Sequence, residues 1–103
     1  MENLCEKIVK KLIEQDKTIS FMESCTGGYL SSQITNVENS SRVLKLGLVT
    51  YSTEYKIKFN VPEEVINTYS VYSKETAQEM ARAISNFAKS DIRSRNNWRT
   101  CKK

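Results

Sequence analysis

Apolar residues near the start of the chain recur at the spacing of an α-helix. Leu4, Ile8, Val9, Leu12 and Ile13 fall on one face of a helical period, and the opposite face is charged. This stripe predicts an amphipathic helix at the beginning of the chain.

Two short runs further along are typical of buried strands. The first is TISFM (18–22), which is rich in β-branched and aromatic residues and is bounded by polar residues. The second is LKLGLVTYS (44–52), in which Gly47 indicates a close approach of another segment to the backbone. We expect each run to form a strand.

A short helix is expected between the two strands. Gly27 and Gly28 interrupt the chain after the first strand, and the next segment, YLSSQIT (29–35), has helical character. A polar loop, residues 36–41, follows it.

The second half of the chain predicts two more helices. Pro62 at a first helical position, with glutamates behind it, begins a short helix through about Asn67. Ser73 is a suitable N-cap for a longer helix. One face of that helix carries Ala77, Met80, Ala81, Ile84, Phe87 and Ala88.

This order of elements predicts an α/β fold in which helices pack on a central sheet. Two strands are too few for such a sheet, and residues 90–92 (SDI) resemble the approach to a third. The pattern then ends in RSRNNWRTCKK (93–103), where Trp98 is the one large apolar residue.

Composition and charge allow one small domain. The chain has 103 residues, 39% of them hydrophobic, which supports a small core. The formal net charge is +4, but five of the 16 basic residues follow Asp91, and no acidic residue does. Residues 1–92 hold 11 basic and 12 acidic side chains, a net charge of −1. The basic character therefore belongs to the tail, and it is poor evidence for a nucleic-acid partner.

Cysteine usage and hydropathy indicate a cytoplasmic protein. Cys5, Cys25 and Cys101 form no C-x-x-C pair, and their odd number suits reduced thiols. We expect neither a disulfide framework nor a zinc site. No apolar run has the length needed to cross a bilayer, so no membrane partner is expected.

The segment ESCTGG (23–28) lies where a strand turns into a helix. This geometry exposes a side chain at the sheet edge, while backbone N–H groups at the helix start face a developing negative charge. Ser24 occupies that turn and is a candidate nucleophile. Because the chain contains no histidine, the base must be a carboxylate or a lysine.

A structural interpretation of the same segment is also open. Ser24 or Thr26 could act only as a helix N-cap, with the glycines permitting close packing. Cys25 could be a thiol nucleophile, but strand alternation directs it away from Ser24, and packing explains it better.

Several motifs together resemble the CinA C-terminal domain family, the nicotinamide-nucleotide amidohydrolases. They are ESCTGG (23–28), NSS (39–41), GLVTYSTEYK (47–56) and VPEE (61–64), in the order and separation of that family. The resemblance extends from about Leu4 to Ile92.

The resemblance implies a three-layer α/β/α domain that converts nicotinamide mononucleotide and water to nicotinic acid mononucleotide and ammonia. The implied mechanism uses a serine and a lysine, without a metal or an organic cofactor. By matching motifs, Ser24 is the nucleophile, Lys56 the base and Tyr51 the source of an assisting hydroxyl. The implied substrate-binding residues are Thr26, Gly27, Gly28, Thr50 and Ser52.

The lysine assignment makes a physical demand. Lysine acts as a base only when neutral, which near neutral pH requires its pKa to fall by roughly three units, or roughly 4 kcal/mol. Burial must supply that shift, although the usual place of a lysine is the solvated surface.

The resemblance stops abruptly after Ile92. Family domains continue there with further strands, a glycine-rich T-G loop and a last helix, whereas this chain continues with the basic residues 93–103. We therefore divide it into a partial CinA C-terminal-like domain, 1–92, and an aberrant basic tail, 93–103. A shifted reading frame explains the tail, since one choice of codons for it encodes a string like the family's next strand and T-G loop one nucleotide later. The gene's nucleotide sequence tests this hypothesis.

An incomplete sheet should leave Lys56 hydrated and protonated, so we expect this chain to have little or no amidase activity. Two alternatives remain. One is a non-catalytic fragment or interaction module that forms homodimers through open sheet edges. The other, weaker one is a small nucleic-acid binder that uses the basic tail and Trp98.

Overall fold

The computed structural model describes residues 3–24 and 27–94. In chain order the elements are α1 (Leu4–Gln15), β1 (Ile19–Glu23), α2 (Tyr29–Thr35), the 3₁₀ turn η1 (Ser40–Arg42), β2 (Leu44–Val49), α3 (Thr53–Lys58), α4 (Glu63–Tyr69), α5 (Lys74–Ala88) and β3 (Ile92–Ser94).

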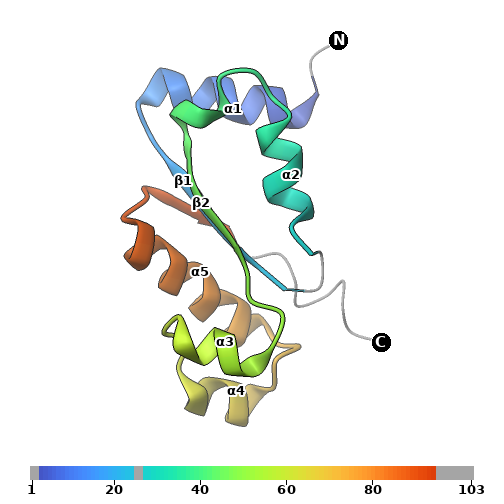
Figure 1. Cartoon of the computed structure of the whole chain (residues 1–103). Helices are drawn as coiled ribbons and strands as arrows, with labels where there is room; N and C mark the ends of the chain where they lie inside the picture. Colours follow the sequence, from blue (N-terminus) through green and yellow to red (C-terminus); the bar gives the residue numbers. More distant parts are fainter. Residues whose placement is uncertain (1–2, 25–26, 95–103) are drawn as a thin grey trace.

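The three strands form one parallel sheet with the order β2-β1-β3, so β1 lies in the middle (Figure 1). Ile19 pairs with Leu44 on one side and with Ile92 on the other. Parallel neighbours need crossover connections, and helices supply them here. The predicted mixed α/β fold with a central sheet is confirmed.

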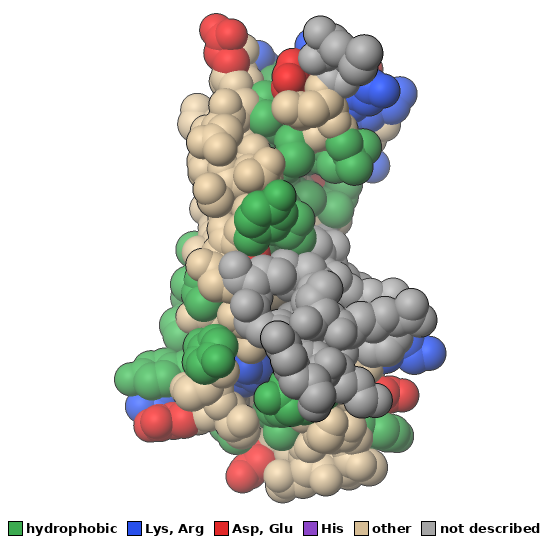
Figure 2. Space-filling view, turned by 90° about the vertical axis from the view of Figure 1, so that its right-hand side faces the viewer, with side chains coloured by type: hydrophobic (Ala, Val, Ile, Leu, Met, Phe, Trp, Pro, Cys, Tyr) green, Lys and Arg blue, Asp and Glu red, His purple; other side chains and the backbone are tan. Residues whose placement is uncertain are grey.

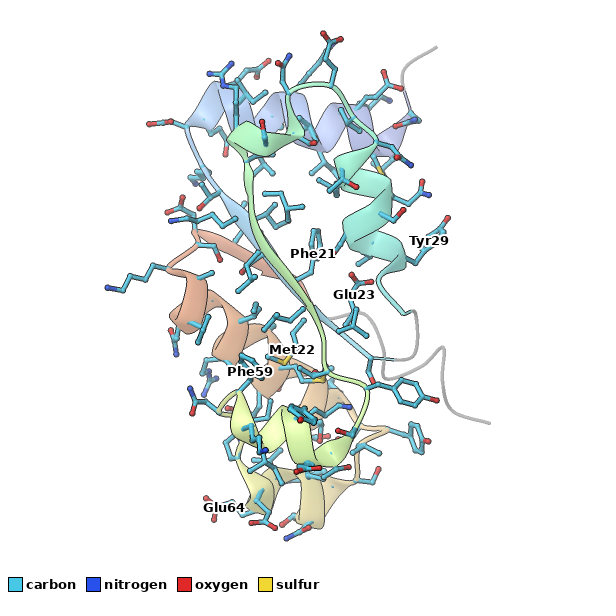
Figure 3. All side chains as sticks on the ribbon, in the orientation of Figure 1. Phe21, Met22, Glu23, Tyr29, Phe59 and Glu64 are labelled. Carbon is cyan, nitrogen blue, oxygen red and sulfur yellow. The ribbon has the colours of Figure 1, made fainter. Side chains whose placement is uncertain are left out.

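Helices cover both faces of the sheet. Successive side chains of β1 point to opposite faces, so neighbouring residues of this strand pack against different helices. Phe21 belongs to a hydrophobic cluster with α1 and α2, and its neighbour Met22 belongs to a second cluster with α4 and α5 (Figure 3). The buried members of the first cluster are Val9, Leu12, Ile19, Phe21, Ile34 and Val43. Those of the second are Met22, Val61, Ile66, Met80, Ala83 and Ile84.

The third strand was expected near residues 90–92 and is present as β3. It runs to Ser94, two residues into the segment that the sequence assigned to the tail. The rest of the predicted tail, including Trp98, lies outside the described residues.

The prediction for residues 44–52 was wrong at its C-terminal end. Strand β2 ends at Val49, and Ser52 is the N-cap of α3, a helix that the sequence analysis missed. The hydroxyl of Ser52 accepts a hydrogen bond from the Tyr55 N–H, which turns the chain out of the extended conformation. Pro62 likewise occupies the N-cap position of α4, one residue earlier than expected.

Gly47 marks the close approach that the sequence indicated. A Cβ at this position would overlap the Ser31 hydroxyl of α2. The missing side chain therefore lets α2 lie directly against β2, which sets the position of the helix that follows the ESCTGG segment.

Several large hydrophobic side chains remain exposed, and Figure 2 shows hydrophobic groups scattered among polar atoms on one face. The exposed residues are Leu4, Tyr29, Val49, Tyr51, Tyr55, Tyr69, Tyr72 and Phe87. Among the described residues, no helix is both long and apolar enough to cross a membrane.

Candidate functional site

Ser24 and Lys56 meet at the C-terminal end of the sheet, although 32 positions separate them in the sequence. The Lys56 Nζ lies 3.0 Å from the Ser24 Oγ. Ser24 is 8% exposed and Lys56 only 2%, so the contact is buried. The nucleophile and the base that the family resemblance implied are thus within hydrogen-bond distance.

Helix α3 places the lysine. Its N-cap, Ser52, directs the chain into the helix just beyond β2, and Lys56 follows one turn later, with its N–H bonded to the Ser52 carbonyl. A helical side chain leans toward the N-terminus of its helix. The amine therefore reaches back to the segment before α3 and donates to the carbonyls of Thr50 (2.7 Å) and Tyr51 (3.2 Å).

The surroundings of Lys56 favour its neutral form, so the expectation that an incomplete sheet leaves this lysine hydrated was wrong, because the side chain is almost fully buried. Burial lowers the pKa of its amine from the ordinary value of 10.5. Among the described residues no carboxylate lies within ion-pair distance of it, so its hydrogen-bond partners are uncharged oxygens. This is the direction of pKa change that a lysine base requires.

A tight turn carries Ser24 toward α2. The Gly27 N–H donates to the Ser24 carbonyl, and Gly28, with a φ of 100°, is the N-cap of α2. That backbone conformation favours glycine. The interpretation of Ser24 as the N-cap is therefore wrong, while Cys25 and Thr26 lie outside the described residues.

Glu23 is the residue that sequence reasoning missed. It is 1% exposed, and its carboxylate accepts hydrogen bonds from the Leu30 N–H (2.9 Å), the Ser31 N–H (3.1 Å) and the Ser31 hydroxyl (2.6 Å). Figure 3 shows its side chain directed toward α2. A carboxylate at the end of an apolar strand was the available signal. Two N–H groups that were expected to face a developing charge are thus already paired.

The other predicted site residues lie around this centre. Thr50 is buried at 2% exposure, and its hydroxyl has no hydrogen-bond partner among the described residues. The Ser52 hydroxyl caps α3. The Tyr51 carbonyl contacts Lys56, whereas its side chain is 75% exposed. Roles in catalysis or substrate binding for these three residues, and for Gly27 and Gly28, stay predictions.

The arrangement has the parts of a serine nucleophile activated by a lysine. A buried amine with a lowered pKa can accept the Ser24 proton, and the alkoxide can then attack an electrophilic carbon. Within residues 3–24 and 27–94, no group of three or more His, Cys, Asp or Glu side chains could hold a metal ion.

Solved structures closely match this fold. A competence-damaged protein (CinA) superfamily protein from Escherichia coli superimposes with a TM-score of 0.84 at 32% identity, covering 87% of this chain and 53% of the other. A competence or damage-inducible protein from Enterobacter asburiae gives a TM-score of 0.82 at 34% identity, covering 85% and 56%. The chain thus spans about half the length of these proteins.

Comparison of the amino-acid sequences also finds similarity to CinA proteins. A CinA-like protein of Dictyoglomus turgidum is 41% identical over 91 residues, which are 87% of this chain and 22% of that protein. The chain therefore spans about a fifth of this relative. The family model of the CinA C-terminal domain matches residues 1–93, and the chain belongs to that family.

Proposed function

We propose that the Ser24–Lys56 site hydrolyses the carboxamide of nicotinamide mononucleotide, giving nicotinic acid mononucleotide and ammonia. The observation that carries the proposal is the buried 3.0 Å contact between the lysine amine and the serine hydroxyl. Membership of the CinA C-terminal domain family supports the site, and the resemblance of the sequence motifs to nicotinamide-nucleotide amidohydrolases supports the substrate.

The proposed reaction has two stages. Neutral Lys56 takes the proton of Ser24, the Oγ bonds to the carboxamide carbon, and the C–N bond breaks as the lysine returns that proton to the leaving nitrogen. Ammonia leaves an acyl ester on Ser24. Lys56 then takes a proton from water, the hydroxide attacks the ester, and the released Ser24 oxygen regains a proton.

The substrate would lie against the turn that carries Ser24. We propose Gly27, Gly28 and Thr26 for the turn side and Thr50 and Ser52 for the β2 side. The buried hydroxyl of Thr50, which has no hydrogen-bond partner in the described part of the chain, supports a polar contact there, because an unpaired buried hydroxyl is costly. Tyr51 would add its hydroxyl at the exposed rim.

Ammonia release from nicotinamide mononucleotide by the purified 103-residue chain tests the proposal. Ser24→Ala is the inactive variant, and Ser41→Ala, an exposed serine, is the matched control. Release that Ser24→Ala abolishes and Ser41→Ala preserves would support the function.

The expectation of weak activity in this chain calls for a second readout. A fluorophosphonate acylates an activated serine without needing the nucleotide pocket. Labelling of Ser24 that requires Lys56, with little ammonia release, would agree with an impaired amidohydrolase. If Ser24 neither reacts with the probe nor supports ammonia release, the proposed function is wrong.

A further inference from the structure

The buried carboxylate of Glu23 connects the nucleophile to α2. Glu23 directly precedes Ser24, and its side chain receives three hydrogen bonds from Leu30 and Ser31 in the first turn of α2. Glu23 therefore contacts two parts of the site: it is bonded directly to Ser24, and its carboxylate accepts hydrogen bonds from the start of α2.

The backbone of Glu23 connects the nucleophile to the base. The Thr50 N–H donates to the Glu23 carbonyl at 2.8 Å, and the Thr50 carbonyl in turn accepts from the Lys56 amine at 2.7 Å. The backbone of Glu23, which a side-chain substitution leaves in place, therefore links Ser24 to the residue whose carbonyl holds Lys56.

The alternation of side chains keeps the Glu23 carboxylate away from the Ser24–Lys56 contact. Because successive side chains along an extended chain point to opposite faces, the Glu23 carboxylate points to α2 (Figure 3), while the Ser24 hydroxyl contacts the Lys56 amine. The arrangement keeps a carboxylate next to the nucleophile in sequence without pairing it with the amine.

We propose that Glu23 is a positioning residue that aligns Ser24 with Lys56 by holding the start of α2, an inference that rests on the proposed role of this pair. Within the first turn of α2, its two oxygens accept from two N–H groups and one hydroxyl, all of which donate. A glutamine at this position has the same shape but one acceptor oxygen, so its amide N–H₂ would face a donor.

The experiment measures the acylation rate of Ser24 by a fluorophosphonate across pH, in wild type and in Glu23→Gln. Rates are compared per folded molecule, below the melting temperature. Glu14→Gln, an exposed glutamate of α1, is the matched control. Ser31→Ala removes one of the three hydrogen bonds from α2 to Glu23 and keeps the carboxylate.

We expect Glu23→Gln to react about 100-fold more slowly, because a small misplacement of reacting groups has an effect of that size. The pH at half-maximal rate should not move, because α3 and residues 50–51 set the environment of Lys56. The acylation rate should fall less in Ser31→Ala than in Glu23→Gln, and it should stay at the wild-type value in Glu14→Gln.

Several results would overturn the proposal. A lower melting temperature with an unchanged rate would make Glu23 merely stabilising, and a shifted pH midpoint would mean that it acts on Lys56 by charge. An unreactive wild-type Ser24 would mean that there is no aligned Ser24–Lys56 pair for Glu23 to position.

A second variant covers the case in which Glu23→Gln does not fold. An unchanged acylation rate in Ser31→Ala would then decide against Glu23 as a positioning residue. Acylation without ammonia release from nicotinamide mononucleotide would count against the proposed substrate alone.

Discussion

Two charged side chains are buried on opposite faces of the sheet at the end of β1, and their partners differ in kind. Glu23 lies toward α2, where three N–H and O–H donors converge on its carboxylate. Lys56 lies on the other face, where it contacts a hydroxyl and two carbonyl oxygens. Both are almost fully buried.

The difference supports the proposed roles of Glu23 as a positioning residue and of Lys56 as a base. Backbone donors at the start of a helix suit an anion, so Glu23 can remain fixed where it is. Lys56 has no charged partner among the described residues, and burial lowers the pKa of its amine. A shifted pKa in such a place is typical of a functional site.

Removing the amine should produce the largest effect. We expect Lys56→Met to lower the acylation rate of Ser24 by about 1000-fold, because a positioned general base contributes about that much. Lys58→Met is the control, since Lys58 is on the same helix but exposed. A variant that keeps the wild-type rate would show that Lys56 is not the base.

Disturbing the α2 face should cost stability. We expect Gly47→Ala to lower the free energy of unfolding by about 2 kcal/mol, because its methyl group would overlap Ser31 and push α2 away. Urea denaturation measures the change. Ser31→Ala in the same chain should restore part of the loss, and additive losses would contradict this contact as the cause.

The lowered pKa of Lys56 predicts a pH dependence of stability. Between the folded-state pKa and 10.5, the unfolded chain binds more protons than the folded one, so stability rises with pH there. Relative to Lys56→Met, the wild-type free energy of unfolding should rise by at most about 1.4 kcal/mol per pH unit. Chemical denaturation at several pH values measures it, and parallel curves for the two proteins would refute the shift.

The smallest effect should come from removing the hydroxyl of the exposed Tyr51 side chain. We expect Tyr51→Phe to slow acylation roughly fivefold, or about 1 kcal/mol, because its carbonyl and not its hydroxyl holds Lys56. The melting temperature should not change, since the side chain is exposed. A loss as large as that of Lys56→Met would instead make the hydroxyl essential.

Local patterns in the sequence were sufficient for much of the fold. The stripe from Leu4 to Ile13 gave α1, Ser73 gave the start of α5, and residues 29–35 gave α2. Helix α3 was missed because VTYS continues the strand pattern, and only the cap formed by Ser52 ends it. Such a cap competes with strand extension and is decided by the packing around it.

The site was less accessible to sequence reasoning. The residues alone indicated Ser24 and excluded histidine, but they could not select Lys56, because its approach depends on the register of β1 against β2 and on α3. Glu23 was missed because its partners belong to a helix whose placement depends on Gly47. The positions of both side chains are determined by contacts between segments that are distant in the sequence.

The three oxygens around the Lys56 amine also bear on how its proton could leave. An ammonium group has three N–H bonds, one for each of Ser24 Oγ, the Thr50 carbonyl and the Tyr51 carbonyl. After deprotonation, two N–H bonds can stay on the carbonyls while the lone pair faces the serine, which then becomes the donor. The polarity of one hydrogen bond reverses and no heavy atom has to move, so the resting contact already has the geometry of the activated one.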